Sequence, residues 1–201
     1  SFSGFSQANY SVTDPEKDFK DAKDFFIKGQ YSVAYPLLRP LLDKYPENTK
    51  SSHAYLNQDI EYYFIVCALK LNQEIAEEDA IRFIDASNNE PRQQLMSFHL
   101  AQYFFTKNDY AHAVMYYERA GYNNLSNEEI ADAKFELAYS DFNVGQFDNA
   151  KPLFNEIHQL PGNKYYYDAN YYLGFLSYRD RDYNEALKSF QKVETIPKYR
   201  A

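Results

Sequence analysis

A short pattern, made of an aromatic residue, two polar or small residues and an alanine, occurs four times in this chain. The four copies are Tyr31-Ser-Val-Ala34, Tyr110-Ala-His-Ala113, Phe147-Asp-Asn-Ala150 and Tyr183-Asn-Glu-Ala186. Recurrence with similar flanking residues is typical of a helical repeat array, in which each unit packs on its neighbours. In such an array we expect function on an extended surface rather than in a deep pocket.

The repeated alanine, together with Ala80, serves as a register mark for five units. Twelve residues before each mark stands a small residue, and four residues after it an apolar one. The small residues are Ala22, Ala68, Ala101, Ala138 and Gly174, and the apolar ones are Leu38, Ile84, Tyr117, Phe154 and Phe190. Small residues let two helices approach closely, and a residue four positions on lies on the same helical face. Each unit is therefore predicted to be a pair of antiparallel helices.

Helix breakers and caps fall where this interpretation needs them. Gly29 and Gly145 lie at the turn within a unit, and prolines follow several second helices. Thr13 to Glu16 and Ser126 to Glu129 have the spacing of a capping box. The helices are predicted near 15–28, 31–44, 53–72, 77–88, 92–106, 110–120, 127–143, 147–158, 165–179 and 183–195.

With a small residue in the first helix, Gly or Asn at the turn, aromatic-x-x-Ala and a closing Pro, the chain resembles the tetratricopeptide repeat (TPR) family. The resemblance implies an all-α, right-handed superhelical solenoid of about five antiparallel helix pairs. The units are about 15–48, 51–91, 92–125, 127–163 and 165–198. The second unit is degenerate, because its turn lacks the aromatic residue.

The first residues of the chain suggest a processed leader, and the last residues suggest that the repeat array continues. Residues 1–14 are interpreted as a leader whose Ser6-Gln-Ala8 could end a secretory cleavage site, or simply as the boundary of a cloned segment. After Pro197 the chain continues as another first helix would begin, so we expect the amino-terminal part of a longer exported bacterial TPR protein. The expected location is periplasmic or envelope-associated, or otherwise cytoplasmic.

Composition narrows the class of partner. The net charge of -8 disfavours nucleic acid, since phosphate binding relies on clustered Lys and Arg. No apolar stretch reaches the roughly 18 residues that a membrane span needs. Apolar residues make up 45% of the chain, with 21 Tyr and 16 Phe, which is ample for a packed interior. The expected partner is a protein or peptide, and the oligomeric state stays open.

In TPR proteins the first helices line the concave side, so the resemblance implies a candidate partner-binding face. Spacing of four then three keeps three residues of each first helix on one stripe. The four stripes are Phe19, Lys23 and Phe26; Phe98, Gln102 and Phe105; Phe135, Tyr139 and Phe142; and Tyr171, Phe175 and Tyr178. We expect stacked units to align these stripes into an aromatic ladder.

Aromatic rings provide a large contact area at small rotamer cost, so such a groove suits an apolar or extended peptide or an amphipathic helix. Flanking Lys23, Gln102, Asn143 and Arg179 would tune specificity. Alternatively, the rings could be filled in against neighbouring helices or covered by residues 1–14. A clamp for a chaperone's terminal carboxylate, which the family builds from Lys and Asn on these positions, is disfavoured because only Lys23 fits.

The sequence indicates no catalytic site, metal site or cofactor. The histidines, at positions 53, 99, 112 and 158, lack metal-ligand spacing, and Cys67 lies in an apolar helix run where a buried thiol is expected. The acidic groups Glu77 to Asp79 and Asp180 to Asp182 suit helix starts. The predicted function is a non-catalytic scaffold for protein–protein interaction. The alternatives are an accessory domain of a larger enzyme or signalling protein, and a self-assembly module.

Overall fold

The computed structural model describes residues 15–44 and 56–199, and over these residues the chain is all-helical, with ten α-helices and no strand. It divides into two compact units, one ending at Ala76 and the other beginning at Glu77. This division falls inside the repeat predicted at 51–91. The predicted leader, including Thr13 of the first capping box, lies outside the described residues.

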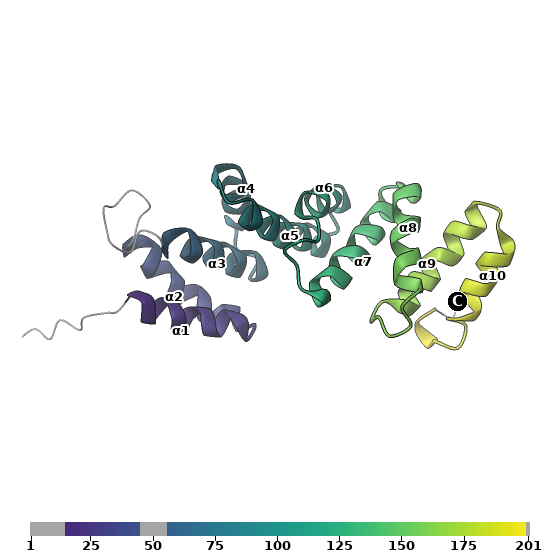
Figure 1. Ribbon diagram of the computed structural model, residues 1–201, viewed down its shortest axis with the longest axis horizontal. Coiled ribbons are helices and arrows are strands. Elements are labelled where there is room, and N and C mark those ends of the chain that lie inside the picture. Colours follow the sequence, from purple (N-terminus) through teal and green to yellow (C-terminus); the bar gives the residue numbers. More distant parts are fainter. Residues whose placement is uncertain (1–14, 45–55, 200–201) are drawn as a thin grey trace, which may run out of the picture. The chain divides into compact units, whose positions relative to one another are not determined.

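The first unit contains α1 (Pro15–Ile27), α2 (Tyr31–Lys44) and α3 (Asn57–Lys70) (Figure 1). Helix α2 packs against both α1 and α3. The core is formed by small and aliphatic side chains that have no exposed surface, among them Ala22, Ala34, Leu38 and Ile60. Helix α3 is apolar on nearly every side, because every residue from Tyr62 to Leu69 is buried.

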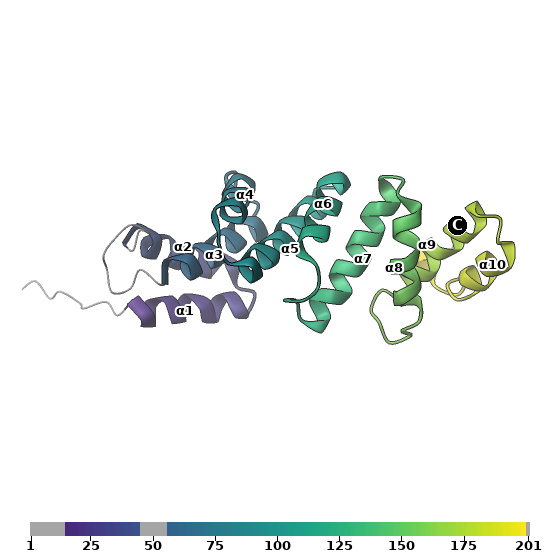
Figure 2. The ribbon, with the colours of Figure 1, turned by 45° about the horizontal axis from the view of Figure 1, so that its top comes forward.

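The second unit contains the remaining seven helices. They are α4 (Ala76–Ala86), α5 (Glu90–Thr106), α6 (Tyr110–Ala120), α7 (Asn127–Asn143), α8 (Phe147–His158), α9 (Tyr166–Arg179) and α10 (Tyr183–Gln191). Helices α5 with α6, α7 with α8 and α9 with α10 form antiparallel pairs, as Figures 1 and 2 show. The first helices α5 and α7 also touch each other, which places their stripes side by side. A cluster around Phe154, Leu173 and Leu176 forms the core of the last two pairs.

The turn within each predicted pair has the same backbone geometry five times. The residues in the left-handed region are Gly29, Asn72, Asn108, Gly145 and Arg181. In each turn the following N–H donates to a carbonyl five residues back, as Gln146 does to Asp141 at 2.8 Å. These are Schellman turns, which satisfy the free carbonyls at a helix end. The prediction of turns at Gly29 and Gly145 is confirmed.

Measured from these turns, the register of small residues holds in four pairs and fails in one. Ala22, Ala101, Ala138 and Gly174 each lie seven residues before the left-handed residue and are buried. In α3 that position is Ile65, and Ala68 instead accepts the turn hydrogen bond from Gln73. The alignment of Ala68 with the other small residues was therefore wrong, because the α3–α4 turn is longer and shifts the alanine mark.

Most helix ends lie within two residues of the predictions, with two larger differences at the start of α3, which is Asn57 rather than near 53, and at the end of α10. Ser126 and Glu129 form the predicted capping box at the start of α7. Helix α10 ends at Gln191 rather than near 195. The segment Pro197–Tyr199 is a single 3₁₀ turn, η2, where another first helix was expected to begin. No helix within the described residues is long and apolar enough to cross a membrane.

Candidate functional site

The first helices of the second unit enclose a hollow of about 330 Å³. Its lining comes from three helices that are consecutive first helices of the repeat, and from the η2 turn. The lining residues are Phe105 of α5, Phe135 and Tyr139 of α7, Asp168, Tyr171 and Tyr172 of α9, and Lys198 and Tyr199 of η2. Four of them, Phe105, Phe135, Tyr139 and Tyr171, belong to the predicted stripes.

A chain of ring contacts runs along this face from one helix pair to the next. The ring centroids of Phe105 and Tyr139 are 5.6 Å apart, and those of Tyr139 and Tyr172 are 5.3 Å apart. Phe142 also meets Tyr172, at 5.1 Å. Edge-to-face contacts at these distances are favourable beyond the area they bury. The predicted aromatic ladder therefore exists within the second unit, although Tyr172, which joins its rungs, was not predicted.

The floor of the hollow is held in place by stacking. Phe135 lies parallel to Tyr165, with 4.2 Å between ring centroids. The Tyr165 hydroxyl donates to Asp132 at 2.7 Å, and Lys164 pairs with the same carboxylate at 2.5 Å. Burial, and then the hydrogen bond to Asp132, raises the pKa of Tyr165. The phenol therefore stays protonated and serves as a fixed donor.

One side of the hollow is polar. The Lys198 ammonium lies 2.6 Å from the Asp168 carboxylate and 5.2 Å from the centre of the Tyr199 ring. The Tyr199 ring in turn lies 4.9 Å from Tyr171. Burial, and then a hydrogen bond to Asp168, raises the pKa of Tyr199 to about 12. Asp168 is thus the anionic group around which the η2 turn is organised.

The structure separates the predicted stripe residues into buried and accessible ones. Phe98 is 1% exposed and Phe135 is 9% exposed, so these two rings belong mainly to the core. Phe105, Tyr139, Phe142 and Tyr171 are half-buried. Phe175 and Tyr178 are 44% and 63% exposed. The first ring of the α5 and α7 stripes therefore packs inward, as the alternative interpretation allowed, while the candidate binding face consists of the remaining rings.

In the first unit the predicted stripe is covered by a neighbouring helix. Tyr63 of α3 lies 5.8 Å from Phe19 and 4.8 Å from Phe26, measured between ring centroids. The Lys23 ammonium lies 5.2 Å from the centre of the same ring. Phe19 is buried, and Lys23 and Phe26 are half-buried. The alternative that rings are filled in against neighbouring helices therefore fits Phe19, whereas Phe26 keeps part of its surface.

The flanking residues expected to tune specificity are partly engaged within the chain. Asn143 donates through its side chain to the carbonyl of Tyr139 at 2.7 Å. Arg179 pairs with Asp148 at 3.1 Å and lies over the Phe147 ring. Gln102 is half-buried on α5. Arg179 therefore joins α9 to α8, whereas the Asn143 hydrogen bond stays within α7.

Sequence reasoning missed Asp168, Tyr172, Lys198 and Tyr199. A signal for Tyr172 did exist, since Tyr63 and Tyr172 both stand nine residues before the left-handed residue of their turn. Lys198 and Tyr199 were interpreted as the start of another helix, so no contact with α9 was expected. Lys198 contacts Asp168 and Tyr199 contacts Tyr171 only because η2 packs against α9.

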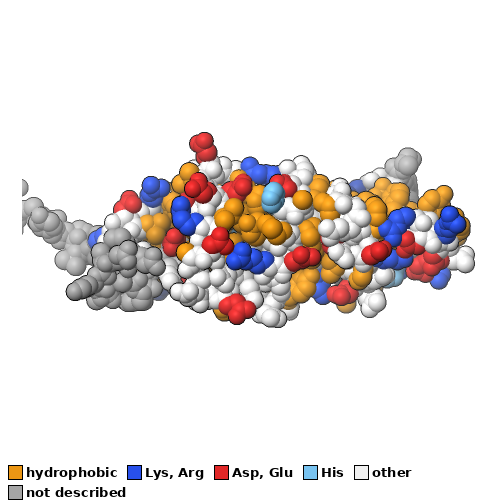
Figure 3. Space-filling model, turned by 90° about the horizontal axis from the view of Figure 1, so that it is seen from above, with side chains coloured by type: hydrophobic (Ala, Val, Ile, Leu, Met, Phe, Trp, Pro, Cys, Tyr) orange, Lys and Arg blue, Asp and Glu red, His pale blue; other side chains and the backbone are white. Residues whose placement is uncertain are grey.

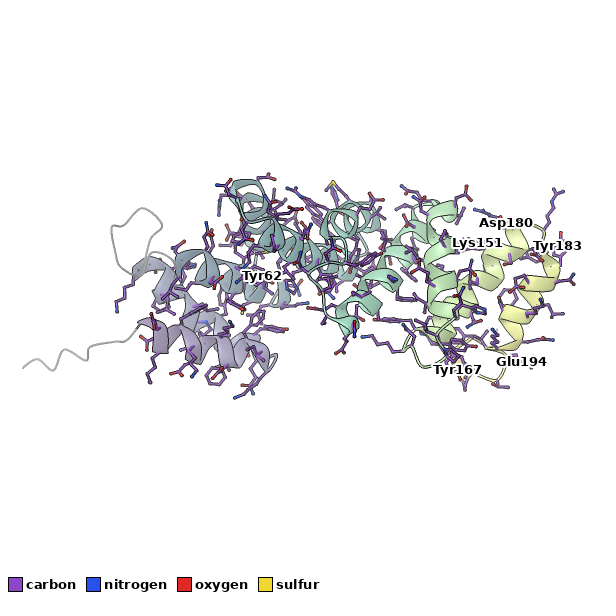
Figure 4. All side chains as sticks on the ribbon, in the orientation of Figure 1. Tyr62, Lys151, Tyr167, Asp180, Tyr183 and Glu194 are labelled. Atoms are coloured by element: carbon purple, nitrogen blue, oxygen red, sulfur yellow. The ribbon has the colours of Figure 1, made fainter. Side chains whose placement is uncertain are left out.

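Other groups in the described residues favour packing over chemistry. Cys67 has no exposed surface, so the predicted burial of this thiol is confirmed, and burial raises its pKa to about 12. Residues 15–44 and 56–199 contain no group of acidic, His and Cys side chains that could hold a metal ion. Lys151 of α8 and Asp180 after α9 form an ion pair at 2.7 Å and lie next to each other in Figure 4.

The fold resembles solved TPR-type structures over nearly the whole chain. A mutant of MamA matches with a TM-score of 0.66, 21% identity, and coverage of 90% of this chain and 94% of that chain. MamA 41-end from Desulfovibrio magneticus RS-1 matches with a TM-score of 0.65 and 14% identity, covering 94% and 99%. A kinesin light chain of Podosopora anserina, with nearly identical TPR-like repeats, matches at 0.61 and 16%, covering 90% and 93%.

The sequence itself matches no protein-family model and no curated protein sequence. At these identities the structural matches bear on the fold and not on a partner. Together with the repeated Schellman turns and the antiparallel pairs, they show that the chain has a TPR-type all-helical fold.

Proposed function

We propose that this chain is a non-catalytic scaffold that binds a peptide or partner protein on the first-helix face of its second unit. The observation that supports this most strongly is the hollow lined by half-buried rings, Tyr139, Tyr171 and Tyr172 among them. Rings that are held by one another but still reach solvent lose little entropy when a partner covers them.

The size of the hollow suggests how a partner would use it. A volume of about 330 Å³ is at the lower end of the range for small-molecule pockets and has room for one or two side chains. A peptide lying across α5, α7 and α9 would insert an anchor there and rest on the exposed Phe175 and Tyr178. Anchors in a pocket surrounded by weaker contacts are the usual arrangement of binding energy at interfaces.

Peptide selection followed by substitution tests this function. Peptides selected from a random library on the folded chain are measured by isothermal titration calorimetry with the native protein, Tyr139→Ala and Tyr171→Ala. We expect each substitution to weaken binding by about tenfold or more, since a hot-spot ring contributes about 2 kcal/mol.

Leu187→Ala is the control. Leu187 is 59% exposed on α10, the second helix of the same pair. It is not among the residues that line the hollow. An equal loss of binding in all three variants would contradict the proposal. Selected peptides whose affinity does not change in Tyr139→Ala or Tyr171→Ala would contradict it as well.

The location of the scaffold is a further part of the proposal. We propose that the protein is exported and works in the cell envelope, supported by Ser6-Gln-Ala8 and by the small and aromatic residues that precede it. Fractionation of the native cells with an antibody against the second unit tests this. Recovery in the cytoplasm, with residues 1–8 still attached, would refute export.

A further inference from the structure

The hollow combines aromatic faces with one carboxylate, and this combination selects a particular kind of side chain. Tyr171, Tyr172 and Tyr199 surround the space, and Asp168 lies at its polar side. The face of an aromatic ring is electron-rich and attracts a cation within about 6 Å. A carboxylate beside several such rings favours a positively charged group over a neutral or negative one.

The chain already places a cation of its own at this position. Lys198 lies 2.6 Å from Asp168 and within 5.2 Å of the Tyr199 ring centre. Its side chain is nevertheless 67% exposed, whereas that of Asp168 is 21% exposed. Ion pairs with an exposed partner stabilise a protein only weakly. A cation from another molecule can therefore replace Lys198 at small cost.

The charges around the hollow favour the same kind of ligand. Asp132 and Glu136 lie on α7 near its floor, where Tyr165 donates to Asp132 and Tyr117 donates to Glu136. Lys164 pairs with Asp132, and Lys198 pairs with Asp168. Three carboxylates face two ammonium groups in this part of the second unit. The full chain is acidic as well, with a formal net charge of -8.

The pKa values of three tyrosine hydroxyls near the hollow are raised partly by the same negative charges. Asp168 contributes to raising the pKa of Tyr165, Tyr172 and Tyr199, after burial in each case. A nearby carboxylate stabilises the neutral phenol and, by the same interaction, a cation placed beside it. Figure 3, which draws one face of the molecule, shows acidic side chains in red interspersed with basic ones in blue.

We propose that the hollow binds a basic side chain of a partner peptide, with its stem against Tyr171 and Tyr172 and its charged head at Asp168 in place of Lys198. This inference rests on the proposed function and names the chemistry of the partner. Arginine is the preferred residue, because its planar guanidinium stacks on rings and forms a bidentate pair with a carboxylate.

The test compares three capped pentapeptides that differ only at the central residue. The probes are acetyl-Gly-Leu-Arg-Leu-Gly-amide and the same peptide with norleucine or glutamate at the centre. Binding is followed by two-dimensional NMR of the protein with labelled tyrosine rings. We expect the arginine peptide to bind about tenfold more tightly than the norleucine peptide, and the glutamate peptide most weakly.

Two substitutions with opposite expected effects make the test specific. Asp168→Asn should weaken binding of the arginine peptide about tenfold, whereas Lys198→Met should strengthen it about threefold by removing the internal competitor. Asp148→Asn and Lys188→Met change the net charge equally on exposed residues that do not line the hollow. Neither control should change the affinity by more than about 1.5-fold in moderate salt.

The outcomes separate this inference from the proposed function. If the norleucine peptide binds as well as the arginine peptide, the hollow takes apolar anchors, so the scaffold function stands and the basic ligand is refuted. If Lys198→Met weakens binding as Asp168→Asn does, the ion pair only supports η2 and the inference also fails. If no peptide shifts the Tyr139, Tyr171 or Tyr172 resonances, both proposals fail.

Discussion

Equivalent helical stripes in the two compact units are buried to the same degree but have different neighbours. In the first unit, Tyr63 of α3 covers the stripe of α1 and contacts both of its phenylalanine rings. In the second unit, the stripe of α7 forms part of a hollow with Tyr171 and Tyr199. The stripes occupy equivalent positions relative to their turns, so position in the repeat does not decide which side chains surround a face.

In both units a contact on the stripe comes from one position of the following first helix. Nine residues before the left-handed turn residue, α3 has Tyr63, α7 has Glu136 and α9 has Tyr172. Tyr63 and Tyr172 each reach back to the preceding stripe. Glu136 instead accepts a hydrogen bond from Tyr117 on α6. A tyrosine at this position therefore contacts the preceding stripe in both units, and the hollow beside α7 arises from additional side chains of α9 and η2.

Removal of the covering ring is expected to have the largest effect. Tyr63→Ala should destabilise the first unit by about 3 kcal/mol, because the ring is 9% exposed and its loss leaves a cavity beside Phe19 and Phe26. Hydrogen exchange measured by mass spectrometry should show faster exchange in α1 with little change in α7 to α10. Tyr63→Phe, which keeps the ring, is the control. If α1 of Tyr63→Ala exchanges its amide hydrogens no faster than α1 of the native chain, Tyr63 does not protect the α1 stripe.

The next effect concerns a close approach of α9 and α10 in the second unit. A Cβ atom added at Gly174 would lie 2.5 Å from Cε1 of Phe190, so Gly174→Ala should cost about 2 kcal/mol. The double variant with Phe190→Leu should recover part of that loss in urea denaturation. Gly162→Ala, which meets nothing within 4 Å, should be close to neutral. An unaffected Gly174→Ala would disprove the tight contact.

A third comparison concerns the residue that accepts the turn hydrogen bond, Phe25 in the first unit and Asp141 in the second. Asp141 is 2% exposed, and its Oδ1 has no hydrogen-bond partner. Burial, and then the charge of Glu118, raises the pKa of Asp141 from 3.8 to about 7. The folded protein therefore binds this proton more tightly than the unfolded chain does, and stability decreases as pH rises from about 4 to about 7.

Asp141→Asn should remove most of this pH dependence. At pH 8 the variant should be more stable than the native chain by roughly 1 to 3 kcal/mol, and at pH 4 the two should be nearly equal. Thermal unfolding of both proteins at the two pH values measures the difference. Asp148→Asn, at an exposed side chain, is the control. If the stability of Asp141→Asn changes with pH in the same way as that of the native chain, another group is responsible for the pH dependence.

The smallest expected effect concerns the turns themselves. Gly29 occupies the left-handed position in the first unit, whereas Arg181 occupies it in the last pair with φ of 66°. Arg181→Gly should stabilise the second unit by about 0.5 to 1 kcal/mol, because glycine adopts this conformation without steric cost. Gly145→Ala, at φ of 82°, should instead destabilise the second unit. Denaturant midpoints measure both, and a loss of stability in Arg181→Gly would overturn the argument.

Much of the fold could be predicted from local signals. The bounds of α6, α7 and α8 agree with the prediction to the residue, because caps, turn residues and apolar periodicity lie within a few positions of one another. One failure has a local cause and the other a tertiary one. The longer α3–α4 turn displaced Ala68 from the repeat register, and contacts of Lys198 and Tyr199 with α9 favour a 3₁₀ turn over a new helix.

The candidate site could be predicted only in part. The stripe rule identified Tyr139 and Tyr171 correctly as members of an aromatic face, because helical period sets which residues share a side. It could not separate them from Phe98, which is 1% exposed, since burial of that ring depends on Tyr117 of the next helix, 6.3 Å away. It also had no means to find Asp168 and Lys198, which are brought together from α9 and η2.

The sequence by itself determined the repeat, its turns and the side of each first helix that carries the rings, because these properties follow from interactions within one or two helical turns. The tertiary structure decided which of those rings remain open and which charges stand beside them. That outcome depends on side chains such as Tyr63, Tyr172 and Lys198, which come from other helices and fill or leave space according to how closely the pairs pack.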